Sequence, residues 1–267
     1  MGIFNLNLDK EGPGVPKDQP PKRGLFRLWE LLTREFLVLL RLGILAALGT
    51  LPGQLLLGLA FQHLLEGRVH TALWLLLFGL LLSIPAGALM TAGSRILSSM
   101  VRDDPGFFWH DFKKSFRDSF RQSLAFGLLY NLLMGLYLPL FFVALQRGSG
   151  VLPFFMGSLL VFYMLYPYYY LQAAYLDLGP LGLLKNSLML AASQIPRTLA
   201  SAACLLAGWV VSLYWFPYSV LPYLLLGYSL PGLISVLFLW PGVDRAFGIQ
   251  EELEQRLHRP DASDNLD

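Results

Sequence analysis

The sequence contains 267 residues, of which 55% are hydrophobic and 14% are charged, and its mean hydropathy is +0.53. This composition is too apolar for an ordinary soluble domain and predicts a membrane protein. The net charge of +2 gives no reason to expect a nucleic-acid partner, and the lone Cys204 excludes an internal disulfide and a cysteine-rich metal site.

The amino-terminal segment differs from the rest of the chain. Residues 1–24 are polar and rich in Pro and Gly, which predicts a flexible cytoplasmic arm and no cleavable signal peptide. Residues 25–35 mix apolar and charged side chains and predict a surface helix. The apolar run 36–65 predicts the first span, with a kink at Pro52 because proline removes one backbone hydrogen bond.

Five further apolar stretches are each long enough to cross a bilayer, which takes about 20 residues. The second span ends in small residues such as Gly87, which predicts close packing against a neighbouring helix. The tyrosine cluster around Tyr168 predicts a membrane–water interface, and Pro231-Gly232 predicts a bend in the last span. The predicted spans are residues 36–65, 72–94, 122–145, 151–176, 198–216 and 221–240.

These elements predict an all-α fold, a polytopic membrane helical bundle of about six transmembrane helices. Two cytoplasmic amphipathic surface helices are expected at about 107–121 and 180–195. The six-span membrane domain is expected to cover residues 25–243, and residues 244–267 form a cytoplasmic tail with a short helix over 249–258.

Lysine and arginine concentrate in alternate connections between the predicted spans. The arm through Arg34 contains six of them and residues 95–121 contain another six, whereas the connections holding Arg68 and Arg147 have one each. Because cytoplasmic loops carry the excess of these residues, both termini and both surface helices are expected on the cytoplasmic side.

The 107–121 segment, here called the aromatic-basic segment, combines a ring-bearing face with a cationic one. Such a helix can lie on a membrane with its rings at the acyl boundary and its cations on anionic headgroups, or it can dock a soluble partner. The predicted lipid- or partner-facing residues are Phe108, Trp109, Phe112, Lys113, Lys114, Phe116, Arg117, Phe120 and Arg121.

Two stretches of the chain carry recognisable motifs. The first follows an acidic turn and has the form D-F-x-x-x-F-x-x-x-x-x-Q, with Asp111, Phe112, Phe116 and Gln122. The second runs from Leu184-Lys185-Asn186 to Pro196-Arg197-Thr198. In these motifs the chain resembles the YesL-like family of bacterial membrane proteins of unknown function. The resemblance implies a bacterial inner-membrane protein, often associated with carbohydrate-uptake genes, and implies no catalytic residue.

Patterns of catalytic chemistry are missing from the sequence. The histidines are scattered and none pairs with acids at metal-ligand spacing, and there is no Gly-rich phosphate loop. The spans after the first carry no Asp, Glu, Lys or Arg away from their ends, which argues against a proton relay. We therefore expect no enzyme activity, no catalytic or metal site and no cofactor.

Two functional hypotheses remain open. The first is a non-enzymatic accessory or assembly factor linked to carbohydrate uptake, which would contact membrane lipids and transport-system proteins. The alternative is a transporter or channel subunit that moves a small solute through a midplane site. The polar residues Gln54, Asn131 and Gln172 are the candidates for that site, although hydrogen bonding between helices is the simpler interpretation of each.

Overall fold

The computed structural model describes residues 24–104, 106–147 and 150–257. Every regular element within these residues is an α-helix, which confirms the predicted all-α bundle. Nearly all of the predicted arm and the end of the tail (258–267) lie outside the described residues. The helices are α1 (Leu25–Arg34), α2 (Phe36–Leu65), α3 (Val69–Leu82), α4 (Ala86–Val101), α5 (Phe108–Arg147), α6 (Val151–Ala173), α7 (Pro180–Ser193), α8 (Ile195–Tyr214), α9 (Val220–Leu226), α10 (Ser229–Phe247) and α11 (Ile249–Leu257).

Six helical stretches of the described chain are long and apolar enough to cross a membrane. They are α2, the α3–α4 pair taken together, α5, α6, α8 and α10. These stretches support a multi-pass membrane protein with six crossings, as the sequence predicts.

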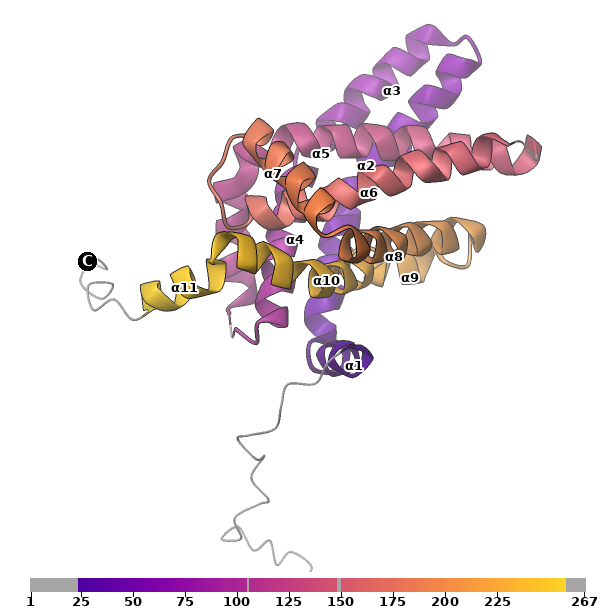
Figure 1. The fold of residues 1–267 in the computed structure, drawn as a ribbon. Helices are drawn as coiled ribbons and strands as arrows, with labels where there is room; N and C mark the ends of the chain where they lie inside the picture. Colours follow the sequence, from indigo (N-terminus) through magenta and orange to yellow (C-terminus); the bar gives the residue numbers. More distant parts are fainter. Residues whose placement is uncertain (1–23, 105, 148–149, 258–267) are drawn as a thin grey trace, which may run out of the picture.

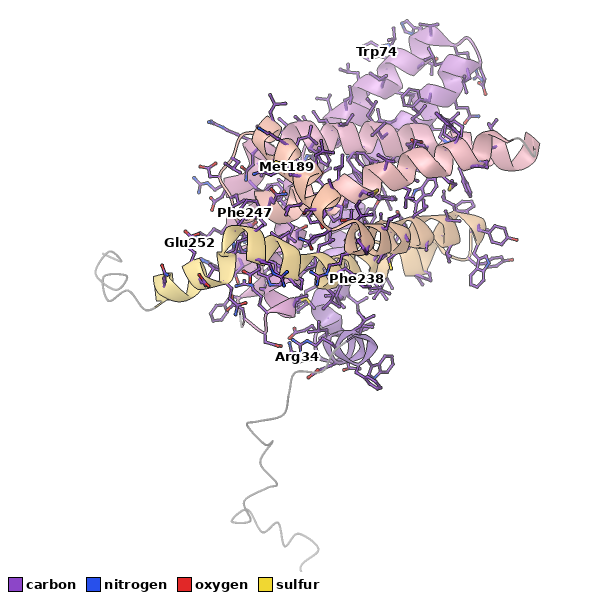
Figure 2. The ribbon with its side chains drawn as sticks, in the orientation of Figure 1. Arg34, Trp74, Met189, Phe238, Phe247 and Glu252 are labelled. Atoms are coloured by element: carbon purple, nitrogen blue, oxygen red, sulfur yellow. The ribbon has the colours of Figure 1, made fainter. Side chains whose placement is uncertain are left out.

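The ends of these helices gather on opposite sides of the bundle (Figure 1). The α8–α9 connection and the start of α6 lie on one side, which we call the loop side. The helices α7 and α11 and the turn between α4 and α5 lie on the other, and α1 lies below the bundle, joined to that turn by its contacts with Asp103; we call this the α1 side. The α2–α3 hairpin projects from the bundle, and Trp74, which is 52% exposed, points outward near its tip (Figure 2).

Two of the predicted spans are broken in the structure. The second consists of α3 and α4, separated by residues 83–85. The sixth is broken at Gly227 and Tyr228, before the predicted position, so that α10 begins at Ser229 and Pro231 lies in its first turn. A proline there costs no helical hydrogen bond, because the first N–H groups of a helix have no partner within it. Helix α10 also extends past the predicted domain boundary at 243, to Phe247.

The aromatic-basic segment is not a separate surface helix. It forms the first turns of α5, which continues without interruption into the third span. The second predicted surface helix is present as α7, which begins at Pro180 after an extended Gly179. Proline suits this first position because its fixed φ matches the helix.

Glycines set the closest helix crossings. Gly87 of α4 meets Gly127 of α5 backbone to backbone, and a Cβ added to either would overlap the other helix. Gly135, which follows Gly127 on α5, lies against Leu57 and the backbone of α2. Small residues let membrane helices approach in this way, which confirms the close packing that Gly87 predicts.

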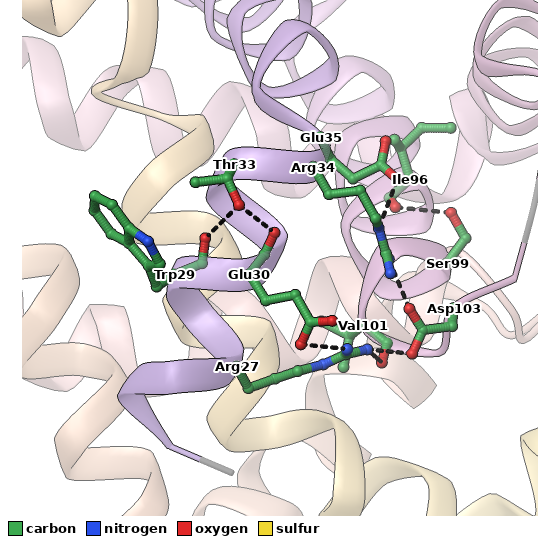
Figure 3. Close-up of polar contacts among 10 residues, drawn as sticks. All are labelled: Arg27, Trp29, Glu30, Thr33, Arg34, Glu35, Ile96, Ser99, Val101 and Asp103. Atoms are coloured by element: carbon green, nitrogen blue, oxygen red, sulfur yellow. Dashed lines mark hydrogen bonds and ion pairs between the residues drawn. The ribbon is translucent and has the colours of Figure 1, made fainter. Parts of the chain in front are cut away.

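Asp103 fastens α1 to the turn after α4 (Figure 3). Arg34 donates a 2.6 Å hydrogen bond to its Oδ1, and Arg27 pairs with its Oδ2. Burial alone raises the pKa of Asp103, but the hydrogen bonds from Arg34 and Arg27 outweigh it and hold this pKa below its usual range. The same pairing raises the pKa of Arg34.

The Asp103 contact gives a pH-dependent prediction. Because the folded-state pKa of Asp103 is depressed, its contribution is present above the unfolded-state pKa of about 3.9 and is lost as the pH falls through the folded value. Asp103→Asn at pH 7 should therefore release α1 from the turn after α4, as protonation of Asp103 at low pH should. The measured result should be faster amide hydrogen exchange over residues 25–34. Asp118→Asn, at an exposed position of α5, is the matched control, and equal exchange in both variants would contradict the prediction.

Candidate functional site

A cavity of about 80 Å³ lies inside the bundle, where the six spans and α9 converge. Tyrosines on three helices line it together with serines, and we call it the tyrosine chamber. On α6, Tyr163 and Tyr166 are three residues apart, so they share one face of the helix. None of the lining residues is charged. Its polar lining comprises Ser94, Tyr130, Tyr163, Tyr166, Tyr223, Tyr228, Ser229 and Ser235.

The tyrosine rings pack on one another around the chamber. The centroids of Tyr130 and Tyr166 are 4.8 Å apart, and those of Tyr223 and Tyr228 are 5.3 Å apart. Such contacts stabilise the wall while leaving hydroxyl groups to bond elsewhere. The wall therefore combines rigid apolar surface with hydroxyls that both donate and accept hydrogen bonds.

A hydrogen-bond chain joins α10, α2 and α5 beside the chamber. The Tyr228 hydroxyl donates to Gln54 Oε1 over 3.2 Å, and Gln54 Nε2 donates to Asn131 Oδ1 over 2.9 Å. Gln54 and Asn131 are 3% and 0% exposed, and Asn131 Nδ2 has no partner. We call this chain the Tyr228–Gln54–Asn131 network. Two of the three predicted midplane residues thus come together.

The third predicted residue, Gln172, lies elsewhere. Its Nε2 donates to the Tyr168 carbonyl and to Ser187 Oγ, so it ties α6 to α7 instead of facing Gln54. Near it, Tyr168, Tyr169 and Tyr170 are almost completely buried. These rings therefore fill space between helices inside the bundle, and the predicted position of the cluster at the level of a membrane–water interface stays a prediction.

The start of α10 forms one wall of the chamber. Gly227 to Ser229, Pro231 and Gly232 all line it. The Ser229 side chain is 3% exposed, and its hydroxyl has no hydrogen-bond partner. A buried polar group without a partner is costly, so Ser229 marks a place where a ligand or water would be stabilised.

A second hollow, of about 380 Å³, lies between α2, α8 and α9. It extends from Phe216 and Ser219 in the α8–α9 connection to Gln54, and we call it the loop-side cleft. Trp209 and Tyr223 line both this cleft and the tyrosine chamber. The two hollows are therefore neighbours, separated by these side chains.

The aromatic-basic segment closes the chamber toward the α1 side. Phe112 is 6% exposed and lines the chamber, and Phe108 and Phe116 pack against the same apolar cluster. Phe112 therefore faces protein, contrary to the predicted lipid- or partner-facing role. The four-residue spacing of the aromatic side chains predicts a ring-bearing face, but it does not distinguish a protein neighbour from a lipid one.

Most of the remaining predicted residues of the aromatic-basic segment face outward. Trp109 is 51% exposed, whereas Phe120 is partly buried beside Phe116. The basic side chains are all exposed, namely Lys113, Lys114, Arg117 and Arg121. The cationic face is thus exposed. That it binds anionic headgroups or a soluble partner stays a prediction.

Arginines that sequence analysis did not single out fix the α1 side of the chamber. Arg95 follows the chamber residue Ser94 and donates to the Ala174 carbonyl over 3.1 Å, with its guanidinium 4.2 Å from the centre of the Tyr175 ring. Arg102 donates to the Tyr175 hydroxyl over 3.2 Å and pairs with Asp104. Within the described residues Arg95 forms no direct ion pair, but it lines a hollow together with Asp111, Asp118 and Asp177.

Among the described residues no three His, Cys, Asp or Glu side chains are grouped as metal ligands would be. The chemistry that the chamber offers is therefore hydrogen bonding and ring contact. Comparisons with protein families, curated proteins and solved structures found no match to this chain.

Proposed function

We propose that this protein is a membrane transport protein that moves a small solute through the tyrosine chamber. The observation that carries the proposal is that Trp209 and Tyr223 line both the chamber and the loop-side cleft. Gln54 of the cleft lining also accepts a hydrogen bond from Tyr228 of the chamber lining, so the two hollows adjoin there as well.

The broken sixth span supports this proposal. Irregular backbone at membrane depth is tolerated where it lines a cavity, and transporters build their midplane sites from discontinuous helices. Here the break between α9 and α10 coincides with the chamber wall at Gly227 and Tyr228.

The two sides of the chamber are unequal, which favours a transporter over an open channel. Toward the α1 side, Leu97, Phe112 and Val236 line the chamber and belong to a tightly packed apolar cluster. Passage would require these side chains to separate. Movement of one part of the bundle against another is the usual way in which transporters expose a fixed site alternately to two sides.

The accessory role in carbohydrate uptake stays a prediction, as do the bacterial inner membrane and the cytoplasmic position of both termini. The exposed cations Lys113, Lys114, Arg117 and Arg121 are the described residues that would serve that role. Anionic headgroups and transport-system proteins are the partners that such a surface suits.

Filling the chamber tests the transport proposal. Gly93 lines the chamber, and a Cβ added there meets no atom within 4 Å, so Gly93→Leu should place its side chain in the cavity without displacing backbone. We expect purified wild-type protein in liposomes to speed the passage of small solutes, with glycerol and potassium salts of small anions as probes. Gly93→Leu should return the rates to those of protein-free liposomes.

Gly157→Leu is the matched control. Gly157 is an exposed position of α6 whose added Cβ also meets no atom within 4 Å, so this variant should transport like the wild type. Thermal midpoints of the three proteins in detergent establish that each is folded. Equal rates for both variants, or no passage of any probe by the wild type, would refute the proposal.

A further inference from the structure

We infer that the tyrosine chamber selects a small monovalent anion, bound by Ser229 and the first turn of α10. This inference rests on the proposed transport function and names the class of its solute. It depends on three features of the chamber, which are the position of the α10 amino terminus with Ser229, the lack of carboxylates in the lining and the size of the cavity.

The amino end of α10 is directed at the chamber. The lining residues Tyr228, Ser229, Pro231 and Gly232 belong to its cap and first turn, and α10 has 19 residues. Pro231 has no N–H, and the Gly232 N–H donates to the Tyr228 carbonyl, so Ser229 is the lining residue within this first turn whose N–H could reach a ligand. The first turn of a helix presents N–H groups without helical partners and carries about half a positive charge. Together these favour an anion, and they do so most strongly away from water, where screening is weak.

Ser229 is an independent sign of a ligand at the same place. Its hydroxyl is buried, has no partner and belongs to the first residue of α10. The Tyr228 hydroxyl lies one residue before it and now donates to Gln54. An anion at the helix end would accept from the Ser229 hydroxyl, which would satisfy the one serine of this wall that lacks a bond.

The chamber lining contains no carboxylate, so a cation would find no counter-charge there. Arg95, which follows the lining residue Ser94, lines a separate hollow that also holds Asp111, Asp118 and Asp177, so its charge does not act on the chamber alone. The partial positive charge of the α10 amino terminus is therefore what favours an anion.

The size of the chamber favours a small anion. Its volume of about 80 Å³ exceeds the roughly 10–15 Å³ that one water molecule needs, so it can hold several waters or a small ion such as halide, nitrate or formate.

The test measures anion and glycerol fluxes in the same liposomes. Wild-type protein in vesicles loaded with potassium chloride or potassium formate, with valinomycin to carry potassium, should release the anion faster than glycerol enters. Ser229→Ala should slow anion release about tenfold, the ratio expected for one hydrogen bond to a charged group. Ser229→Thr keeps the hydroxyl and should retain the wild-type rate of anion release. Ser229→Asp should abolish anion release, because its carboxylate repels the anion.

Ser193→Ala, at an exposed position of α7, is the matched control and should behave like the wild type. If glycerol passes and the anions do not, or if Ser229→Ala and Ser229→Asp release anions at the wild-type rate, the anion inference is overturned while transport stands. If neither probe passes, the transport proposal itself fails. An anion flux that Ser229→Asp removes and Ser229→Thr preserves supports both.

Discussion

Gly87→Leu and Gly127→Leu are each expected to prevent the bundle from folding. The backbones of α4 and α5 touch at these two glycines, and a Cβ on Gly87 would also overlap the Ser123 carbonyl. Overpacking a core by a few methylenes costs about 1–3 kcal/mol when side chains can move aside. Here the obstacle is backbone on both sides, so the cost should exceed that range.

Fluorescence-detected gel filtration in mild detergent measures this effect directly. Both variants should lose the monodisperse peak of the wild type. Gly157→Leu adds the same side chain at an exposed position of α6 where the Cβ meets nothing within 4 Å, and it should keep the peak. A normal peak and thermal midpoint for Gly87→Leu would mean that the α4–α5 crossing is looser than these contacts require.

The fold was largely predictable because its signal is local. Long uncharged runs specify spans, and the first predicted span, 36–65, coincides with α2. The small residues around Gly87 likewise predict a close helix approach, because side-chain size is also a local property of the sequence. The break in the sixth span lies a few residues before the predicted position, because Pro231 is accommodated in the first turn of α10 while Gly227 and Tyr228 interrupt the helix.

The candidate site was less predictable, because membrane helices have apolar neighbours on every side. The regular spacing of Phe108, Phe112 and Phe116 identifies a face but does not say whether protein or lipid covers it. Protein covers Phe112. In the same way, tyrosines suit both a headgroup belt and a packed interior, and only the arrangement of α5, α6, α9 and α10 brings Tyr130, Tyr166 and Tyr228 around one chamber.

Gln54 and Asn131 show what polar residues in spans can and cannot reveal. Both predicted a bond between helices, and that bond is present between α2 and α5. Gln172 gave the same local signal but serves a different pair, α6 and α7. Which glutamine meets which partner depends on the order of helices around the bundle, and no residue pattern within one span encodes it.

Gln54→Leu should destabilise the bundle by roughly 1–3 kcal/mol, the usual cost of leaving buried polar groups unbonded. The change keeps most of the side-chain volume but removes both bonds of the Tyr228–Gln54–Asn131 network. Asn131 is 0% exposed, and its Nδ2 has no partner. Without Gln54 its Oδ1 would lose its donor as well, so the Asn131 side chain would have no hydrogen bond. Gln62→Leu, an exposed position on the same helix, should be nearly neutral.

A double-mutant cycle separates the bond from the effects of each substitution alone. Asn131→Leu should also destabilise, whereas Gln54→Leu with Asn131→Leu removes donor and acceptor together and should cost less than the sum of the two. Thermal or denaturant midpoints of the four proteins in one detergent give the coupling. We expect it to exceed the roughly 0.6 kcal/mol that is average between membrane helices, because neither amide has access to water as a substitute. Strict additivity would mean that the two amides find other partners when separated, and the network would then have no part in holding α2 against α5 beside the chamber.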